Sequence, residues 1–124
     1  MLATVEARPE FAELGVLLVW VPMLLTDSAA MAAAADGALP LEAVRFGDPD
    51  RTAAGAVAAA IGAPGETAWD MYLFFQAGTA WETYLPAPLT WVHQLHSTWA
   101  DRSKMALGPD LFAALVSAAA TTLD

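Results

Sequence analysis

The stretch from Gly15 to Val21 reads GVLLVWV, a continuous apolar run rich in valine and leucine. Such a run is typical of a β-strand that is covered on both faces, as in the parallel sheets of α/β proteins. Pro22 follows directly and lacks the backbone N–H that a strand ladder needs, so it ends the strand. We therefore predict that Gly15 to Val21 forms the central strand.

Helices and strands are predicted to alternate after this strand. A helix is expected over residues 26–35, capped by Thr26, Asp27 or Ser28 and stopped by Gly37. A short strand is expected from Ala43 to Phe46. Asp48 followed by Pro49 is typical of an N-cap with proline at the first helical position, which predicts a second helix that runs to Ile61 and ends at Gly62.

The second half of the chain supplies a predicted hairpin and a last helix. Asp70 to Gln76 (DMYLFFQ) is another apolar run, and a glycine-containing turn joins it to a partner strand expected from Ala80 to Leu85. The segment from Leu89 to Trp99 is predicted to be partly helical. The final helix starts at 108–110 (GPD), and its apolar residues share one face: Leu111, Phe112, Leu115 and Val116.

This order of elements predicts an α/β fold. Two strand–helix units followed by a hairpin and a helix form a mixed sheet covered by helices, because parallel neighbours need crossover connections. The 124 residues suffice for one domain, residues 1–124, with one core.

Charge and hydropathy exclude several classes of partner. The formal net charge is -9 at pH 7, with only five basic residues, so the chain repels nucleic acid and anionic membranes and favours a basic or neutral partner. The apolar stretch 16–35 is broken by Pro22 and by the polar residues 26–28, and neither half reaches the roughly 20 residues of a membrane span. The N-terminus lacks the pattern of a secretory signal. We expect a soluble, cytoplasmic protein.

The order of elements resembles that of thioredoxin-like domains over roughly Gly15 to Leu123, and the best-matched piece is residues 16–28, VLLVWVPMLLTDS. The resemblance implies a three-layer sandwich in which a mixed central sheet with a C-terminal β-hairpin carries helices on both faces. Thioredoxins place reactive cysteines on the loop after this strand. Here that loop is residues 21–27, and the chain contains no cysteine, so no thiol–disulfide activity is expected. The Trp-x-Pro strand end and Thr-Asp turn are similar to redoxin-like bacterial proteins that also lack the cysteines and have no characterised activity.

Thioredoxin-like proteins hold a cis proline directly before the third strand, facing the active site. Pro64 is the nearest candidate, although residues 65–69 intervene before the apolar run that begins at Asp70. X-Pro bonds are trans in about 95% of cases in folded proteins, which favours a trans bond between Ala63 and Pro64. The resemblance makes Pro64 a candidate for a partner-binding groove.

Three residues are candidates for acid–base chemistry. Asp27 lies near the end of the central strand, a habitual ligand position in α/β proteins, although an N-cap role is the favoured explanation. His93 and His96 would share a face on a helix and point oppositely on a strand. No third metal ligand stands at a recognisable spacing, so we expect no metal site and no cofactor. With Asp27, either histidine defines an alternative function, a non-redox enzyme or a small-molecule or metal-binding protein with a pocket at the strand ends.

The chain is rich in tryptophan, with five, four of them in its second half: Trp20, Trp69, Trp81, Trp91 and Trp99. Core packing explains Trp20. Trp81, Trp91 and Trp99 can either pack in the core or line a groove for an apolar ligand or a partner. No hydrolase triad order, phosphate loop or metalloprotease pattern occurs. We therefore predict a non-catalytic thioredoxin-like protein that binds a protein partner, or forms a homo-oligomer, through its aromatic second half.

Overall fold

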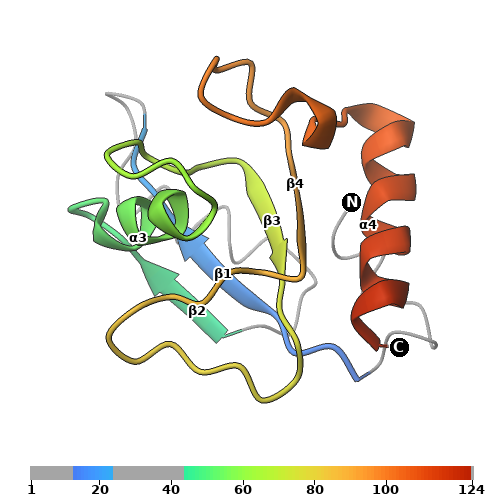
Figure 1. Cartoon of the computed structure of the whole chain (residues 1–124), viewed down its shortest axis with the longest axis horizontal. Helices are drawn as coiled ribbons and strands as arrows, with labels where there is room; N and C mark the ends of the chain where they lie inside the picture. The colour runs from blue at the N-terminus through green and yellow to red at the C-terminus, as the bar shows by residue number, and fades with distance from the viewer. Residues whose placement is uncertain (1–12, 24–43, 124) are drawn as a thin grey trace.

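The computed structural model describes residues 13–23 and 44–123 (Figure 1). The predicted helix over 26–35 and the candidate Asp27 lie outside the described residues. The described part of the chain forms six regular elements and a short 3₁₀-helix: β1 (Leu17–Trp20), β2 (Val44–Gly47), α3 (Thr52–Ala60), β3 (Met71–Phe74), β4 (Thr90–His93), η2 (Arg102–Lys104) and α4 (Gly108–Leu123). This mixture confirms the predicted α/β class.

The four described strands pair into two small sheets. β1 is parallel to β2, with Leu17 opposite Val44, and β3 is antiparallel to β4, with Met71 opposite His93. Figure 1 shows β3 and β4 between the β1–β2 pair and α4. Neither described helix is long and apolar enough to cross a membrane.

The strand β1 forms where the apolar run predicted it. Its side chains alternate between exposed and half-buried positions, and Leu17 is 54% exposed. The neighbouring strand β2 exposes Phe46 on the same sheet. The prediction that this strand is covered on both faces was therefore wrong for the described structure, because an apolar run alone does not show how many layers cover a strand.

The predicted partner of β3 was also wrong. Residues 80–85 belong to a loop over 75–89, and β3 pairs instead with Thr90–His93, inside the segment predicted to be partly helical. Pro86 and Pro88 lack the backbone N–H that a strand ladder needs, so strand pairing does not begin until after them, at β4. The β4 sequence TWVH begins with β-branched and aromatic residues, which suit a pleated strand better than a helix.

The core described by the structure lies between the β3–β4 pair and α4. Leu115 and Ala119 are completely buried there, and Leu111 and Val92 are nearly so. Phe112 and Val116 pack against this cluster, which confirms the apolar face predicted for the last helix. The side chains meet because residues three and four apart lie on one face of a helix.

Asp48 caps α3 from a position before the helix. One carboxylate oxygen accepts the N–H of Ala53 at 3.0 Å, and the other accepts the N–H of Ala54 at 2.8 Å. Asp48 thus binds N–H groups of the first turn, but the predicted N-cap position was wrong, because the helix begins at Thr52, its N-cap residue is Arg51 and Pro49 is not its first residue. Arg51 precedes the helix with φ at 59° and donates from Nε to the carbonyl oxygen of Pro22 at 2.9 Å, which ties this turn to the end of β1.

Asp48→Ala should lower the free energy of unfolding by about 2 kcal/mol, because two N–H groups at the start of α3 lose their acceptor while the site stays buried. Asp48→Asn should lose less, since one side-chain oxygen remains. The exposed Asp50 provides a matched control, and Asp50→Ala should change stability little. Urea unfolding at pH 7 measures all three; equal losses for Asp48→Ala and Asp50→Ala would refute the capping role.

Candidate functional site

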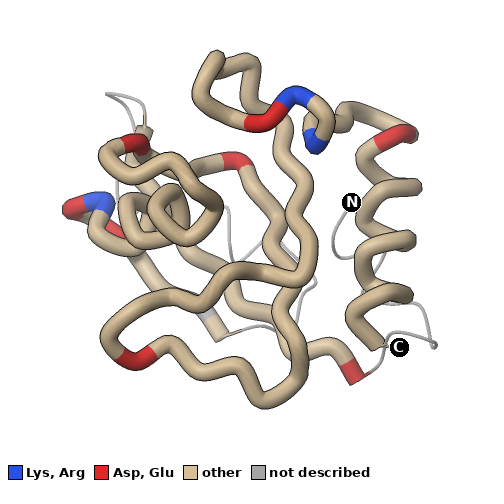
Figure 2. The backbone as a smooth tube through the Cα atoms, viewed as in Figure 1, with Lys and Arg blue, Asp and Glu red and all other residues tan. Residues whose placement is uncertain are grey.

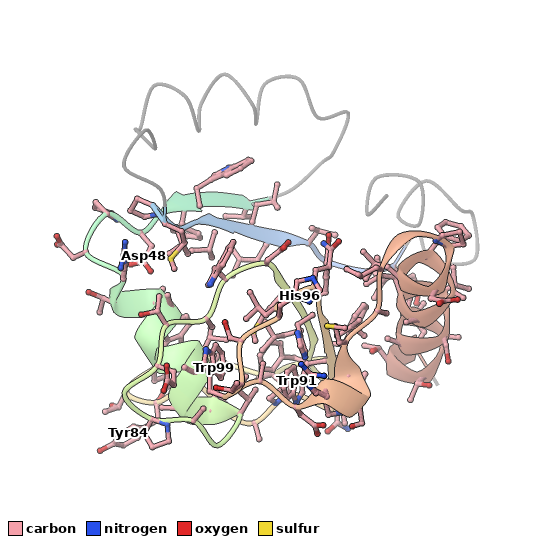
Figure 3. The ribbon with its side chains drawn as sticks, turned by 90° about the horizontal axis from the view of Figure 1, so that it is seen from above. Asp48, Tyr84, Trp91, His96 and Trp99 are labelled. Atoms are coloured by element: carbon pink, nitrogen blue, oxygen red, sulfur yellow. The ribbon has the colours of Figure 1, made fainter. Side chains whose placement is uncertain are left out.

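A pocket of about 500 Å³ lies between the end of α3 and the loop that follows β4. Its volume falls in the range of ligand-binding pockets, roughly 300 to 1,000 Å³. Ten residues line it: Ile61, Gly62, Ala63, Trp91, Thr98, Trp99, Ala100, Asp101, Arg102 and Lys104. Figure 3 shows Trp91 and Trp99 near each other in the region between α3 and η2. The structure therefore brings two of the predicted binding tryptophans to one cavity.

His93 holds the pocket-lining loop in place. Its ring is completely buried, and Nε2 lies 2.7 Å from the backbone oxygen of Asp101. The other ring nitrogen, Nδ1, accepts the N–H of Leu95 at 2.9 Å. A neutral imidazole with its proton on Nε2 satisfies both contacts, so Nε2 donates and Nδ1 accepts. These two bonds fasten both ends of the loop from Leu95 to Asp101.

Trp91 is held by His93, on the same face of β4, and by Lys104 of η2. Its ring stacks on the ring of His93, with the ring centroids 5.6 Å apart, because residues two apart on a strand point to the same side. The Lys104 ammonium lies 5.3 Å from the centroid of the Trp91 ring, within reach of a cation–π interaction. Trp91 therefore has both a stacked ring and a cation against it.

The Asp101 side chain caps the start of η2. Its Oδ1 accepts the Ser103 hydroxyl at 2.7 Å and the Ser103 N–H at 2.9 Å. The hydroxyl bond is the largest cause that lowers the pKa of Asp101 below its ordinary value, followed by the N–H bond, and the nearby Lys104 ammonium adds a smaller contribution. Asp101 is thus an ionised cap rather than a free acid or base.

A second pocket, of about 320 Å³, lies between β4, η2 and α4. Trp91 and Lys104 line both pockets, so this pair separates them. The α4 residues of the second pocket are Ala114, Ser117, Ala118 and Thr121. Their side chains are small, and the second pocket contains no second tryptophan.

Two of the predicted binding residues lie outside the first pocket. Trp81 is 44% exposed in the loop over 75–89 and lines neither pocket described above. Pro64 is exposed and follows Ala63, which does line the first pocket. The described residues contain no cis peptide bond, so the Ala63–Pro64 bond is trans.

The two histidines do not form a shared site. His93 is buried, whereas His96 is exposed, and both ring nitrogens of His93 are already hydrogen-bonded. His93 can act as a base or a metal ligand only after it loses one of these bonds. Among the described residues, no group of three or more histidine, aspartate or glutamate side chains could hold a metal ion. The pairing of either histidine with Asp27 lies outside the described residues.

The sequence prediction missed the charged rim of the first pocket. Arg102 and Lys104 belong to the short segment Asp101-Arg102-Ser103-Lys104, which holds two of the five basic residues in the whole chain. That local concentration was a usable signal. The net charge of the whole chain is strongly negative and conceals this local cluster of basic residues.

Comparison with known proteins does not assign the pocket. No family model matches the chain, and neither a curated protein nor a solved structure is similar to it. The function must therefore be inferred from the residues of the pocket themselves.

Proposed function

We propose that this protein is a non-catalytic, thioredoxin-like domain that binds a protein partner through the pocket formed by Trp91 and Trp99. The order of the described elements is compatible with that fold. β1 is parallel to β2, α3 follows, and the antiparallel β3–β4 pair precedes α4. The chain has no cysteine, so a thioredoxin-like scaffold would serve binding rather than thiol exchange.

The observation that carries the proposal is the meeting of Trp91 and Trp99 in one open cavity. Tryptophan and arginine are enriched among the residues that contribute most to protein–protein binding, and such residues cluster in pockets. Arg102 lines the same cavity. The pocket therefore has the residue types of an interaction site.

The acid–base groups near the pocket support a non-catalytic role. Asp101 is bound to Ser103, and His93 uses both ring nitrogens to hold the loop. General acid–base catalysis needs a group that is free to exchange a proton with a substrate. Asp101, which lines the pocket, and His93, which lies behind the loop, are already engaged in structural bonds.

Trp99→Ala should weaken peptide binding at least tenfold, because a tryptophan at the centre of a binding pocket contributes about 2 kcal/mol or more. Trp99 is preferred to Trp91 as the test because Trp91 also stacks on His93. The probe is a set of peptides selected from a random display library on the wild-type protein, with affinities measured by fluorescence anisotropy.

The matched control is Trp81→Ala, which removes an exposed tryptophan outside the pocket and should leave the affinity unchanged. Light scattering with size-exclusion chromatography shows in parallel whether the protein self-associates and whether Trp99→Ala abolishes that association. The proposal fails if Trp81→Ala weakens binding and Trp99→Ala does not. It also fails if the protein is strictly monomeric and no peptide is enriched.

A further inference from the structure

We infer that the partner segment is an acidic peptide, whose apolar side chain contacts Trp91 and Trp99 and whose carboxylates are bound by Arg102 and Lys104. This inference rests on the proposed function, because it names the chemistry of the partner at the same pocket. It differs from the expectation drawn from net charge, which favoured a basic or neutral partner.

The charges that line the pocket do not balance one another. Three of its lining residues are charged, namely Asp101, Arg102 and Lys104. The carboxylate of Asp101 accepts both bonds from Ser103. Within the part of the chain that the structure describes, neither Arg102 nor Lys104 forms a salt bridge. Asp101 keeps its negative charge in these bonds, so the two cations outnumber the one carboxylate and leave a net positive charge beside the tryptophans.

The position of Lys104 adds a second argument. Its ammonium lies over the Trp91 ring, so its positive charge is positioned beside that ring and does not extend into solvent. Arg102 is exposed and lies on the same short helix, η2. An arginine guanidinium can bind a carboxylate with two parallel hydrogen bonds, and a lysine supplies a point charge. A ligand that contacts the tryptophans and binds both cations must combine apolar and acidic groups.

The net charge of the chain does not oppose this local preference. Figure 2 shows the basic residues of η2 at one end of the molecule, away from the charged residues around the start of α3. Asp110, in the first turn of α4, does not line the pocket. At physiological ionic strength the Debye length is about 8 Å, so more distant carboxylates are largely screened.

A polyanion is a poorer fit than a peptide. Binding of a nucleic-acid backbone draws on many phosphate contacts, whereas this pocket offers two cations on a strongly acidic chain. Two carboxylates, or one carboxylate bound by both cations, match what is available. The adjacent tryptophans account for an apolar side chain next to the acidic group.

The test begins with a random peptide display library selected on the wild-type protein. Enriched peptides should contain aspartate or glutamate beside an apolar residue. One such peptide and its counterpart with glutamine in place of glutamate are then titrated by fluorescence anisotropy. The glutamine counterpart should bind at least tenfold more weakly to the wild type, and raising the salt concentration should weaken the acidic peptide alone.

The double variant Arg102→Gln/Lys104→Gln should bind the acidic peptide at least tenfold more weakly and should not distinguish it from its glutamine counterpart. Arg51→Gln removes a positive charge outside the pocket and should keep the discrimination. Circular dichroism confirms that each variant is folded, and both changes in the double variant lie on solvent-accessible side chains.

The possible failures are distinguishable. Neutral or basic peptides that bind the wild type and lose affinity in Trp99→Ala would overturn the inference and leave the proposed function standing. Equal affinities of the acidic peptide and its glutamine counterpart would likewise overturn the inference and leave the proposed function standing. Peptides that bind Trp99→Ala and wild type equally would overturn both, as would a selection that enriches nothing on a strictly monomeric protein.

Discussion

His93→Ala is expected to lower the free energy of unfolding by about 3 kcal/mol and to abolish peptide binding at the Trp91–Trp99 pocket. The ring is completely buried, so its removal leaves a cavity and takes a hydrogen-bond partner from two backbone groups. Those groups are the N–H of Leu95 and the carbonyl oxygen of Asp101, which bound the loop that lines the pocket. Urea unfolding at pH 7, followed by tryptophan fluorescence, measures the loss.

The matched control for His93 is the other histidine of the chain. His96 is exposed, so His96→Ala should change the free energy of unfolding by less than about 0.5 kcal/mol and leave binding intact. His93→Gln should recover part of the loss, because an amide can replace one of the two hydrogen bonds. Equal stabilities for His93→Ala and His96→Ala would show that the buried ring does not hold the loop.

Local signals in the sequence predicted most of the described elements. β1 follows from the apolar run that Pro22 ends, and α4 follows from an apolar face that begins after a Gly-Pro-Asp sequence. That Asp48 binds N–H groups at the start of a helix was predictable, though not its exact position, because a cap depends on neighbours close in sequence. Each of these features is decided within one or two turns of chain.

The partner strand of β3 was harder to predict from the sequence. The sequence favours the nearest apolar segment after β3 as its partner, whereas the structure pairs β3 with Thr90–His93, beyond the loop over 75–89. Pairing across a loop of that length depends on which segment can also pack its face on α4. Val92 meets that requirement, since it is buried with Leu115 in the core. This choice depends on tertiary contacts and not on local propensity.

The site was predicted in residue type but not in arrangement. An excess of tryptophan indicated an aromatic surface, and Trp91 and Trp99 do share a cavity, whereas Trp81 lies in the loop over 75–89. Trp91 and Trp99 meet at one cavity because His93 fastens the intervening loop at both ends. A histidine with both nitrogens bonded to backbone cannot be distinguished by sequence from one that is free for chemistry.

Leu115→Ala should lower the free energy of unfolding by about 3 kcal/mol, because Leu115 is completely buried between α4 and β4 and its truncation leaves a cavity. That is a large fraction of the roughly 5 to 15 kcal/mol that stabilise a typical domain. Leu123 lies near the end of the same helix and is 39% exposed, so Leu123→Ala makes the same chemical change and should cost less than about 1 kcal/mol. Urea unfolding compares the two variants.

Leu115→Ala also separates stability from binding. Leu115 does not line the Trp91–Trp99 pocket, so the variant should keep wild-type peptide affinity when assayed at a temperature where it is fully folded. His93→Ala, with a similar loss of stability, should not bind. If both variants lost binding while folded, the pocket would depend on the packing of α4 against β4. Loss of binding in His93→Ala alone would instead assign that dependence to the two hydrogen bonds that hold the loop from Leu95 to Asp101.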